Sequence, residues 1–284
     1  MSNRPLYTRF DGLELAVDGP LAAMRRAGAV IGNTLREAGR TRIFYGLLVA
    51  ALALLVFSLV LSDLALVDQK ARLVQDFGLF VIPLIGVVTA VILGVVLLQK
   101  EIEKKTLYAI LPKPIRRSEF LLGKYAGLAI LLAAEVIALA LCWFLVLWLR
   151  GGTVGWPLVA ALLLGYVEIL LVTAIATFFS ALSAPILSGV LTVGLFLVGR
   201  VSYVVNDLLG ASKGVFAEVP AMRALGKVIV AVVPDLSTFN VADELLLGWR
   251  VPTDYLLAAI GYGLTYALVF LVLGLIVFER RDLT

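Results

Sequence analysis

The sequence predicts an all-α membrane protein with six transmembrane helices, on the basis of its composition, its long apolar runs and the placement of its basic residues. Of the 284 residues, 62% are hydrophobic and 15% are charged, and the mean hydropathy is +1.04. Soluble domains contain about 45–50% apolar and about 25% charged residues. A hydrocarbon core about 30 Å thick is crossed by a helix of about 20 apolar residues, and runs of that length recur along the chain.

Six apolar runs are long enough to span. They cover residues 43–62, 77–98, 121–148, 158–182, 186–205 and 255–278. The first run follows a long polar and basic segment, and no small-residue cleavage site comes after it, so we expect it to remain in the mature protein.

The basic residues predict the orientation of these spans. Most of the 24 Lys and Arg residues lie in segments 4–42, 100–124 and 280–281. Short loops rich in Lys and Arg stay in the cytoplasm. We therefore predict cytoplasmic ends over 1–42 and 279–284, a transmembrane domain over 43–278, a cytoplasmic loop over 99–120 and an extracytoplasmic loop over 206–254.

The segment before the first span shows helical periodicity. After Asp18-Gly19-Pro20, a helix-start signal, apolar and small residues recur every three or four positions and arginines occupy the other faces. The first set is Met24, Gly28, Ile31, Leu35 and Ala38, and the second is Arg25, Arg26, Arg36 and Arg40. This pattern predicts an amphipathic helix in the membrane interface; the alternative is an upstream extension of the first span.

The later connections differ in length. The fourth and fifth runs are joined by the short uncharged segment 181–184, which predicts a tight hairpin with Pro185 opening the fifth helix. The outer loop carries helical spacing over 219–233, and Pro234 ends it. This stretch is too short to span, so we predict a re-entrant or interfacial helix.

Small residues four apart indicate close helix packing in two spans. They are Gly86, Ala90 and Gly94 in the second run, and Gly123 and Gly127 in the third. Small residues let helix backbones approach in lipid. The pattern fits packing within one subunit and packing between two subunits equally.

The residue inventory excludes several kinds of chemistry. The chain has no histidine and one cysteine, Cys142, so His-based triads, His metal sites and an intrachain disulfide are excluded. No phosphate-binding loop is present, because Gly123-Lys124 lacks the upstream glycine and the following Ser or Thr. We predict no metal site, no bound cofactor and no enzyme active site in this chain.

The cytoplasmic loop is the most informative segment. Residues 99–124 read QKEIEKKTLYAILPKPIRRSEFLLGK, which predicts a short helix over 106–111 broken by Pro112 and Pro114. This segment resembles that of ABC-2-type permeases, which have paired acids, Gly-Thr-Leu, two apolar residues, a proline, an arginine and Gly-Lys. The matching positions are Glu101, Glu103, Thr106, Leu107, Ile110, Leu111, Pro114, Arg117, Gly123 and Lys124; Lys105 stands where the pattern has glycine.

The resemblance extends over about residues 31–281 and includes two further segments. Residues 33–38 precede the first span, and Pro234-Asp235-Leu236 with Phe239-Asn240 lies in the outer loop. The chain is most similar to permeases of multicopper-enzyme maturation, such as nitrous-oxide reductase assembly, and of gliding systems.

The resemblance implies the inner-membrane subunit of a bacterial exporter. Two permease subunits, here a homodimer, would each rest on a cytoplasmic ATPase subunit, which would bind ATP and Mg²⁺. The helix over 106–111 would be the coupling helix, with Glu101, Glu103, Arg116 and Arg117 in charged contacts around it. A periplasmic partner at the outer loop and membrane lipids are further expected partners, and nucleic acid is not. Without the resemblance, the loop is an ordinary solvated basic loop.

Two acids lie within apolar runs, Glu135 and Glu168. A carboxylate at the bilayer centre costs about 2.5–3.5 kcal/mol on insertion scales, so we expect both to face the bundle interior. There they would be protonated, bond to hydroxyls such as Thr173 or Thr177, or contact substrate. Arg200 is expected to extend to the outer interface.

Two other functions fit parts of the sequence. A secondary transporter would use the intramembrane acids for protons, but it predicts inverted repeats and broken helices, which the sequence lacks. A membrane scaffold or mechanotransmitter would use the same coupling loop to act on a periplasmic partner through the long outer loop.

Overall fold

The computed structural model describes residues 20–66, 69–103, 117–210, 219–246 and 251–280. Within these ranges the chain is helical and contains no strand. The all-α prediction is confirmed for this part of the chain.

Six of the helices are long and apolar enough to cross a membrane, which confirms the predicted number of spans. They are α3 (Arg42–Asp63), α4 (Lys70–Glu103), α6 (Arg117–Leu149), α7 (Trp156–Leu182), α8 (Pro185–Gly210) and α12 (Thr253–Arg280). Several begin or end outside the predicted apolar runs, because charged residues such as Lys70, Glu103 and Arg117 are good helix formers and continue the helices past the apolar part.

Shorter elements complete the fold. The helix α2 (Pro20–Gly39) begins at the predicted proline, and α10 (Pro220–Val232) occupies the helical stretch of the outer loop. The 3₁₀ turn η3 (Leu236–Phe239) and α11 (Ala242–Leu246) follow it. The orientation of the bundle and the interfacial placement of α2 and α10 stay predictions.

The core forms around α7, which packs against α4, α6, α8 and α12. Small residues make these contacts close. A Cβ atom on Gly94 of α4 would lie 2.9 Å from the Cβ of Ala176, and Gly86 faces Ile169 in the same way. Glycines at such contacts let helix backbones approach closely, which favours helix association in lipid, where burial of apolar surface does not.

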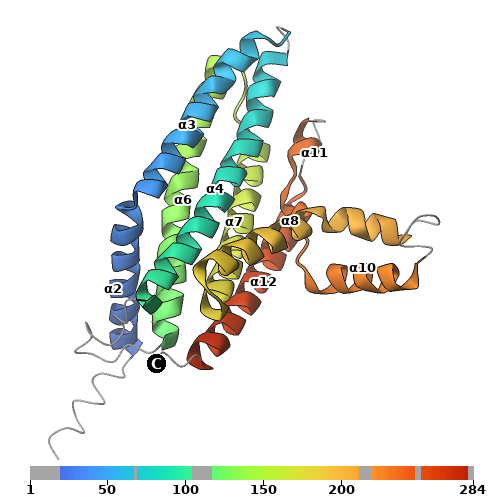
Figure 1. Cartoon of the computed structure of the whole chain (residues 1–284). Helices are drawn as coiled ribbons and strands as arrows, with labels where there is room; N and C mark the ends of the chain where they lie inside the picture. The colour runs from blue at the N-terminus through green and yellow to red at the C-terminus, as the bar shows by residue number, and fades with distance from the viewer. Residues whose placement is uncertain (1–19, 67–68, 104–116, 211–218, 247–250, 281–284) are drawn as a thin grey trace, which may run out of the picture.

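The bundle has two distinct ends (Figure 1). The helix α2 lies at the end where α4 finishes and α6 begins, and the turn between α3 and α4 lies at the opposite end. The last part of α8 and α10 pack against each other and extend to one side of the bundle. The buried residues of α8 are all small or polar, namely Ser188, Thr192, Gly199 and Ser202.

Candidate functional site

The start of α6 is the candidate site, because it directly follows the loop predicted to meet an ATPase. Thr106, Leu107, Ile110, Leu111, Pro114 and Arg116 lie outside the described residues, and Glu101 and Glu103 belong to the last turn of α4, without described side chains. Arg117 and Lys124 are described, and both make contacts to other helices.

An ion pair joins α2 to the first turn of α6. Arg26 Nε donates to Glu119 Oε2, and Arg26 Nη2 donates to Glu119 Oε1, each at 2.9 Å. Both side chains are largely shielded from solvent. The two parallel hydrogen bonds fix the guanidinium and carboxylate planes, so this contact defines orientation as well as distance.

A second ion pair lies five residues further along α6. Lys124 Nζ is 3.1 Å from Glu37 Oε2, and the exposed fractions of the two side chains are 3% and 30%. The same ammonium lies 5.8 Å from the centroid of the Phe120 ring, within cation–π range. A lysine this buried needs a compensating charge, and α2 supplies it.

Two glycines of α6 let α2 approach closely beside these pairs. A Cβ on Gly123 would lie 2.8 Å from Val30 Cβ, and one on Gly127 would lie 2.7 Å from Thr34 Cβ. Real Cβ atoms essentially never come that close. The predicted small-residue packing is therefore present here, and its partner is α2 of the same chain.

The start of α6 also contacts the end of α12. Arg117 Nη1 donates to the carbonyl oxygens of Phe278 and Glu279, both at 3.1 Å. The last carbonyls of a helix have no intrahelical partner, and a cation there also interacts favourably with the helix dipole. Phe120 stacks on Phe278 with ring centroids 6.2 Å apart. One turn of α6 thus contacts both α2 and α12.

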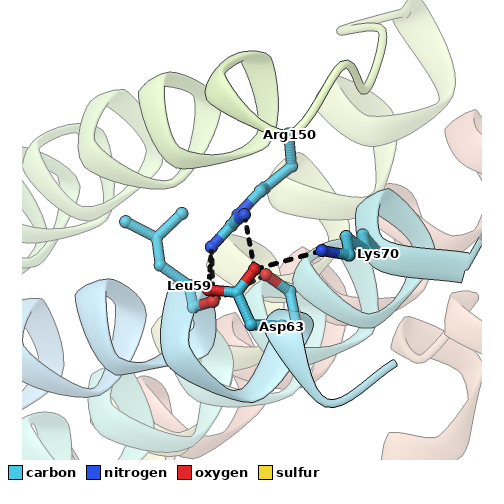
Figure 2. A network of polar contacts seen from close by, with 5 residues as sticks. Leu59, Asp63, Lys70 and Arg150 are labelled. Carbon is cyan, nitrogen blue, oxygen red and sulfur yellow. Dashed lines mark hydrogen bonds and ion pairs between the residues drawn. The ribbon is translucent and has the colours of Figure 1, made fainter. Parts of the chain in front are cut away.

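At the opposite end of the bundle, one carboxylate connects three helices (Figure 2). Asp63 accepts hydrogen bonds from Arg150 at 2.9 and 3.0 Å and from Lys70 at 3.1 Å, and Arg150 also donates to the Leu59 carbonyl at 2.6 Å. Arg150 can reach this position because Gly151, with φ of 74°, ends α6 in the left-handed conformation. The ends of α3 and α6 and the start of α4 are held together there.

Glu135 is buried between α4 and α6. The Thr89 hydroxyl donates to Glu135 Oε1 at 2.9 Å, and Oε2 has no hydrogen-bond partner among the described residues. Thr173 and Thr177, the hydroxyls expected to bind the acids, instead donate to carbonyls of their own helix, at Ile169 and Thr173.

Glu168 is also buried, and it pairs with Arg200. Glu168 Oε1 accepts a hydrogen bond of 2.6 Å from Arg200 Nη1, with exposed side-chain fractions of 2% and 33% respectively. Arg200 therefore has a carboxylate partner that the sequence analysis did not foresee, and its position at the outer interface stays a prediction. A small cavity of about 20 Å³ beside the pair is also lined by Asn240 and Pro83.

A polar contact missed by the sequence reasoning holds the turn between α7 and α8. Gln99 Nε2 donates to the carbonyls of Ser180 at 3.0 Å and Ser183 at 2.6 Å. The hydroxyls of Ser183 and Ser188 lie 2.9 Å apart. The predicted short turn is present, and Gln99 of α4 satisfies its carbonyls.

Comparison with known proteins gives one family. A family model described as "ABC-2 family transporter protein" matches residues 29–283. A search of curated proteins finds no match.

Proposed function

We propose, from the premise that this chain belongs to the ABC-2 transporter family, that it is the permease subunit of an ATP-driven exporter. ABC-2 membrane proteins are transport subunits, and this chain is a multi-pass membrane protein with six apolar helices. A separate ATPase subunit would bind ATP and Mg²⁺. The coupling loop over 99–120 would receive the motion of that ATPase subunit.

The observation that carries this proposal is the set of contacts at the start of α6. The predicted coupling loop leads directly into α6, where Glu119 and Lys124 bind α2 and Arg117 binds the end of α12. A displacement of the loop would therefore move α6, α2 and the end of α12 together. An ordinary solvated loop would not require shielded ion pairs at the start of the helix that follows it.

The finer assignments are part of the same proposal. Both ends of the chain would lie in the cytoplasm of a bacterial cell, two copies of the chain would stand side by side, and each would rest on one ATPase subunit. The motif residues favour the subgroup of multicopper-enzyme maturation and gliding permeases. Glu135 and Glu168 are candidate substrate-pathway residues, since both are buried acids in spanning helices.

A mechanotransmitter acting on a periplasmic partner is the second candidate. It is favoured by α8 and α10, which extend together to one side of the bundle and leave Leu225, Val228 and Val232 of α10 exposed. Such a protein would use the same coupling loop. The two functions differ in whether a substrate crosses the membrane.

ATP hydrolysis in lipid nanodiscs tests the proposal. The purified chain is measured alone and with its candidate ATPase subunit, and the native sequence is compared with Thr106→Asp plus Leu107→Asp. The matched control is Thr153→Asp plus Val154→Asp, two exposed residues in the connection between α6 and α7.

We expect activity only with the ATPase subunit, strong loss in the loop variant and native activity in the control. If no ATPase associates and the loop variant behaves like the native chain, the exporter proposal fails. A proton-coupled role for Glu135 and Glu168 would then be the function to test.

A further inference from the structure

An open hollow lies at the elbow between α2 and α3. Its volume is about 750 Å³, and its polar lining comes from Asn33, Arg36, Arg40, Thr41 and Arg42, with Ile43 at its edge. Arg36 and Arg40 lie one helical turn apart, and Arg42 follows the turn at Thr41. Three arginines, from the end of α2, the turn after it and the start of α3, therefore line one concave surface.

These three cations are uncompensated. All three arginines are exposed, and none forms an ion pair with a described residue. The acid that lines the hollow, Glu37, binds Lys124 through its Oε2 atom at 3.1 Å. Like charges this close repel one another, so a ligand with negative charge would bind favourably here.

The depth of the hollow points to a lipid. Arg42 is the first residue of α3, a helix long and apolar enough to cross a membrane, and the end of such a span would place the hollow at the level of the headgroups. The lining combines the arginines and polar side chains with Ile43, the second residue of α3, whose side chain is half-exposed. A soluble anion would bind the arginines but would gain nothing from contact with Ile43.

We propose that this hollow binds the headgroup of an anionic phospholipid, with its phosphate held by Arg36, Arg40 and Arg42. Guanidinium groups suit phosphate because they offer paired donors in a plane, and basic pockets at the cytoplasmic side of membrane helices bind such headgroups. Binding by three side chains at one place differs from the general attraction of basic residues to an anionic membrane surface. Glu37 lines the hollow and also pairs with Lys124 of α6, so a bound lipid would lie next to a contact that joins α2 to α6.

Lipid binding to the purified full chain tests the proposal. The chain in neutral detergent is titrated with short-chain phosphatidylglycerol or phosphatidylcholine, and bound lipid is counted by native mass spectrometry. The test variant carries Arg36→Gln, Arg40→Gln and Arg42→Gln. The matched control carries Arg25→Gln, Arg72→Gln and Arg223→Gln, which removes the same charge from exposed positions outside the hollow.

The native chain and the control are expected to prefer phosphatidylglycerol. Each arginine removed from the hollow should weaken that binding about fivefold, as for a basic residue near an anionic membrane surface. If the triple variant does not fold, Arg40→Gln alone provides the same test, with an expected loss of about fivefold. Equal lipid preference in the test variant and the control would overturn the proposal.

Two further measurements separate the lipid from other anions. If glycerol phosphate binds with the same dependence on the three arginines and competes at equal concentration, the hollow is a soluble-anion site and the lipid proposal falls. If the test variant keeps its lipid preference but loses the ATPase subunit in phosphatidylcholine nanodiscs, the arginines bind protein instead. Loss of lipid preference with retained ATPase binding supports the proposal.

Discussion

At the scale of single residues, the molecule buries ionisable side chains in its core, and each of them has a defined neighbour. Lys124 has Glu37, Glu168 has Arg200, and Glu135 has the Thr89 hydroxyl. Removing one partner of a buried pair leaves the other charge uncompensated, and this costs about 3–5 kcal/mol for a fully buried pair. These pairs are therefore sensitive positions.

Lys124→Glu is expected to lower the free energy of unfolding by about 3 kcal/mol, because it would place a second carboxylate beside Glu37. Unfolding in an SDS titration measures the change. The double variant Glu37→Lys plus Lys124→Glu restores opposite charges and should recover most of the loss. A swap that is no more stable than Lys124→Glu alone would show that the pair does not join α2 to α6.

Arg200→Gln is expected to destabilise the protein by up to about 3 kcal/mol, because Glu168 would stay buried without its cation. Adding Glu168→Gln should reduce the loss, since two neutral amides can bond to each other. Thermal unfolding in detergent measures both variants. Equal melting temperatures for the native chain and Arg200→Gln would contradict this role.

The sequence predicted that the two acids would be shielded, but it could not predict their partners. Glu135 and Glu168 are both buried, as an insertion cost predicts. Which side chain meets each acid depends on how two helices are rotated about their axes. Thr89 and Arg200 come from α4 and α8, and no periodicity within α6 or α7 identifies them.

At the scale of elements, glycine positions determine which helices approach closely. Gly123 and Gly127 lie against α2, while a Cβ added to Gly28 or Gly32 of α2 would meet no side chain or other helix within 4 Å. A sequence pattern identifies small residues but does not distinguish these two situations, because all four occur at helical spacing.

Gly127→Val is expected to reduce stability by about 1–3 kcal/mol, because the added methyl groups would collide with Thr34. Gly32→Ala is the control, and it should gain about 0.5–1 kcal/mol because a helical glycine loses more backbone entropy on folding than alanine. SDS unfolding of the two variants gives both values. A Gly127→Val variant as stable as the native chain would place α2 further from α6 than described.

Element ends were predictable where a residue type dictates them. Pro20 and Pro185 begin α2 and α8, because proline suits the first turn of a helix. The apolar runs predicted each span, but the helices α4 and α6 continue past their apolar runs through charged residues. Hydropathy cannot detect those extensions, which depend on helix propensity and neighbouring contacts.

At the scale of the whole molecule, contacts distant in sequence connect the predicted coupling loop to the rest of the bundle. Arg26 and Glu119 are 93 residues apart, and Glu37 and Lys124 are 87 apart. At the other end, Asp63 and Arg150 hold the ends of α3 and α6 together. The sequence indicated the family and the number of spans, but pairings at this separation require the folded chain.

These contacts join α2 and α3 to α6, and Arg117 joins the start of α6 to the end of α12. We therefore expect motion received at the start of α6 to carry α2 with it. We propose that this transfer of motion depends on the Arg26–Glu119 contact.

ATP turnover of the assembled complex in nanodiscs, measured for Glu119→Arg and for Arg26→Glu plus Glu119→Arg, tests that claim most directly. The Glu119→Arg variant is expected to bind the ATPase subunit without stimulating its hydrolysis of ATP, and the double variant is expected to regain this stimulation. Native turnover in Glu119→Arg, or no recovery in a folded double variant, would contradict it.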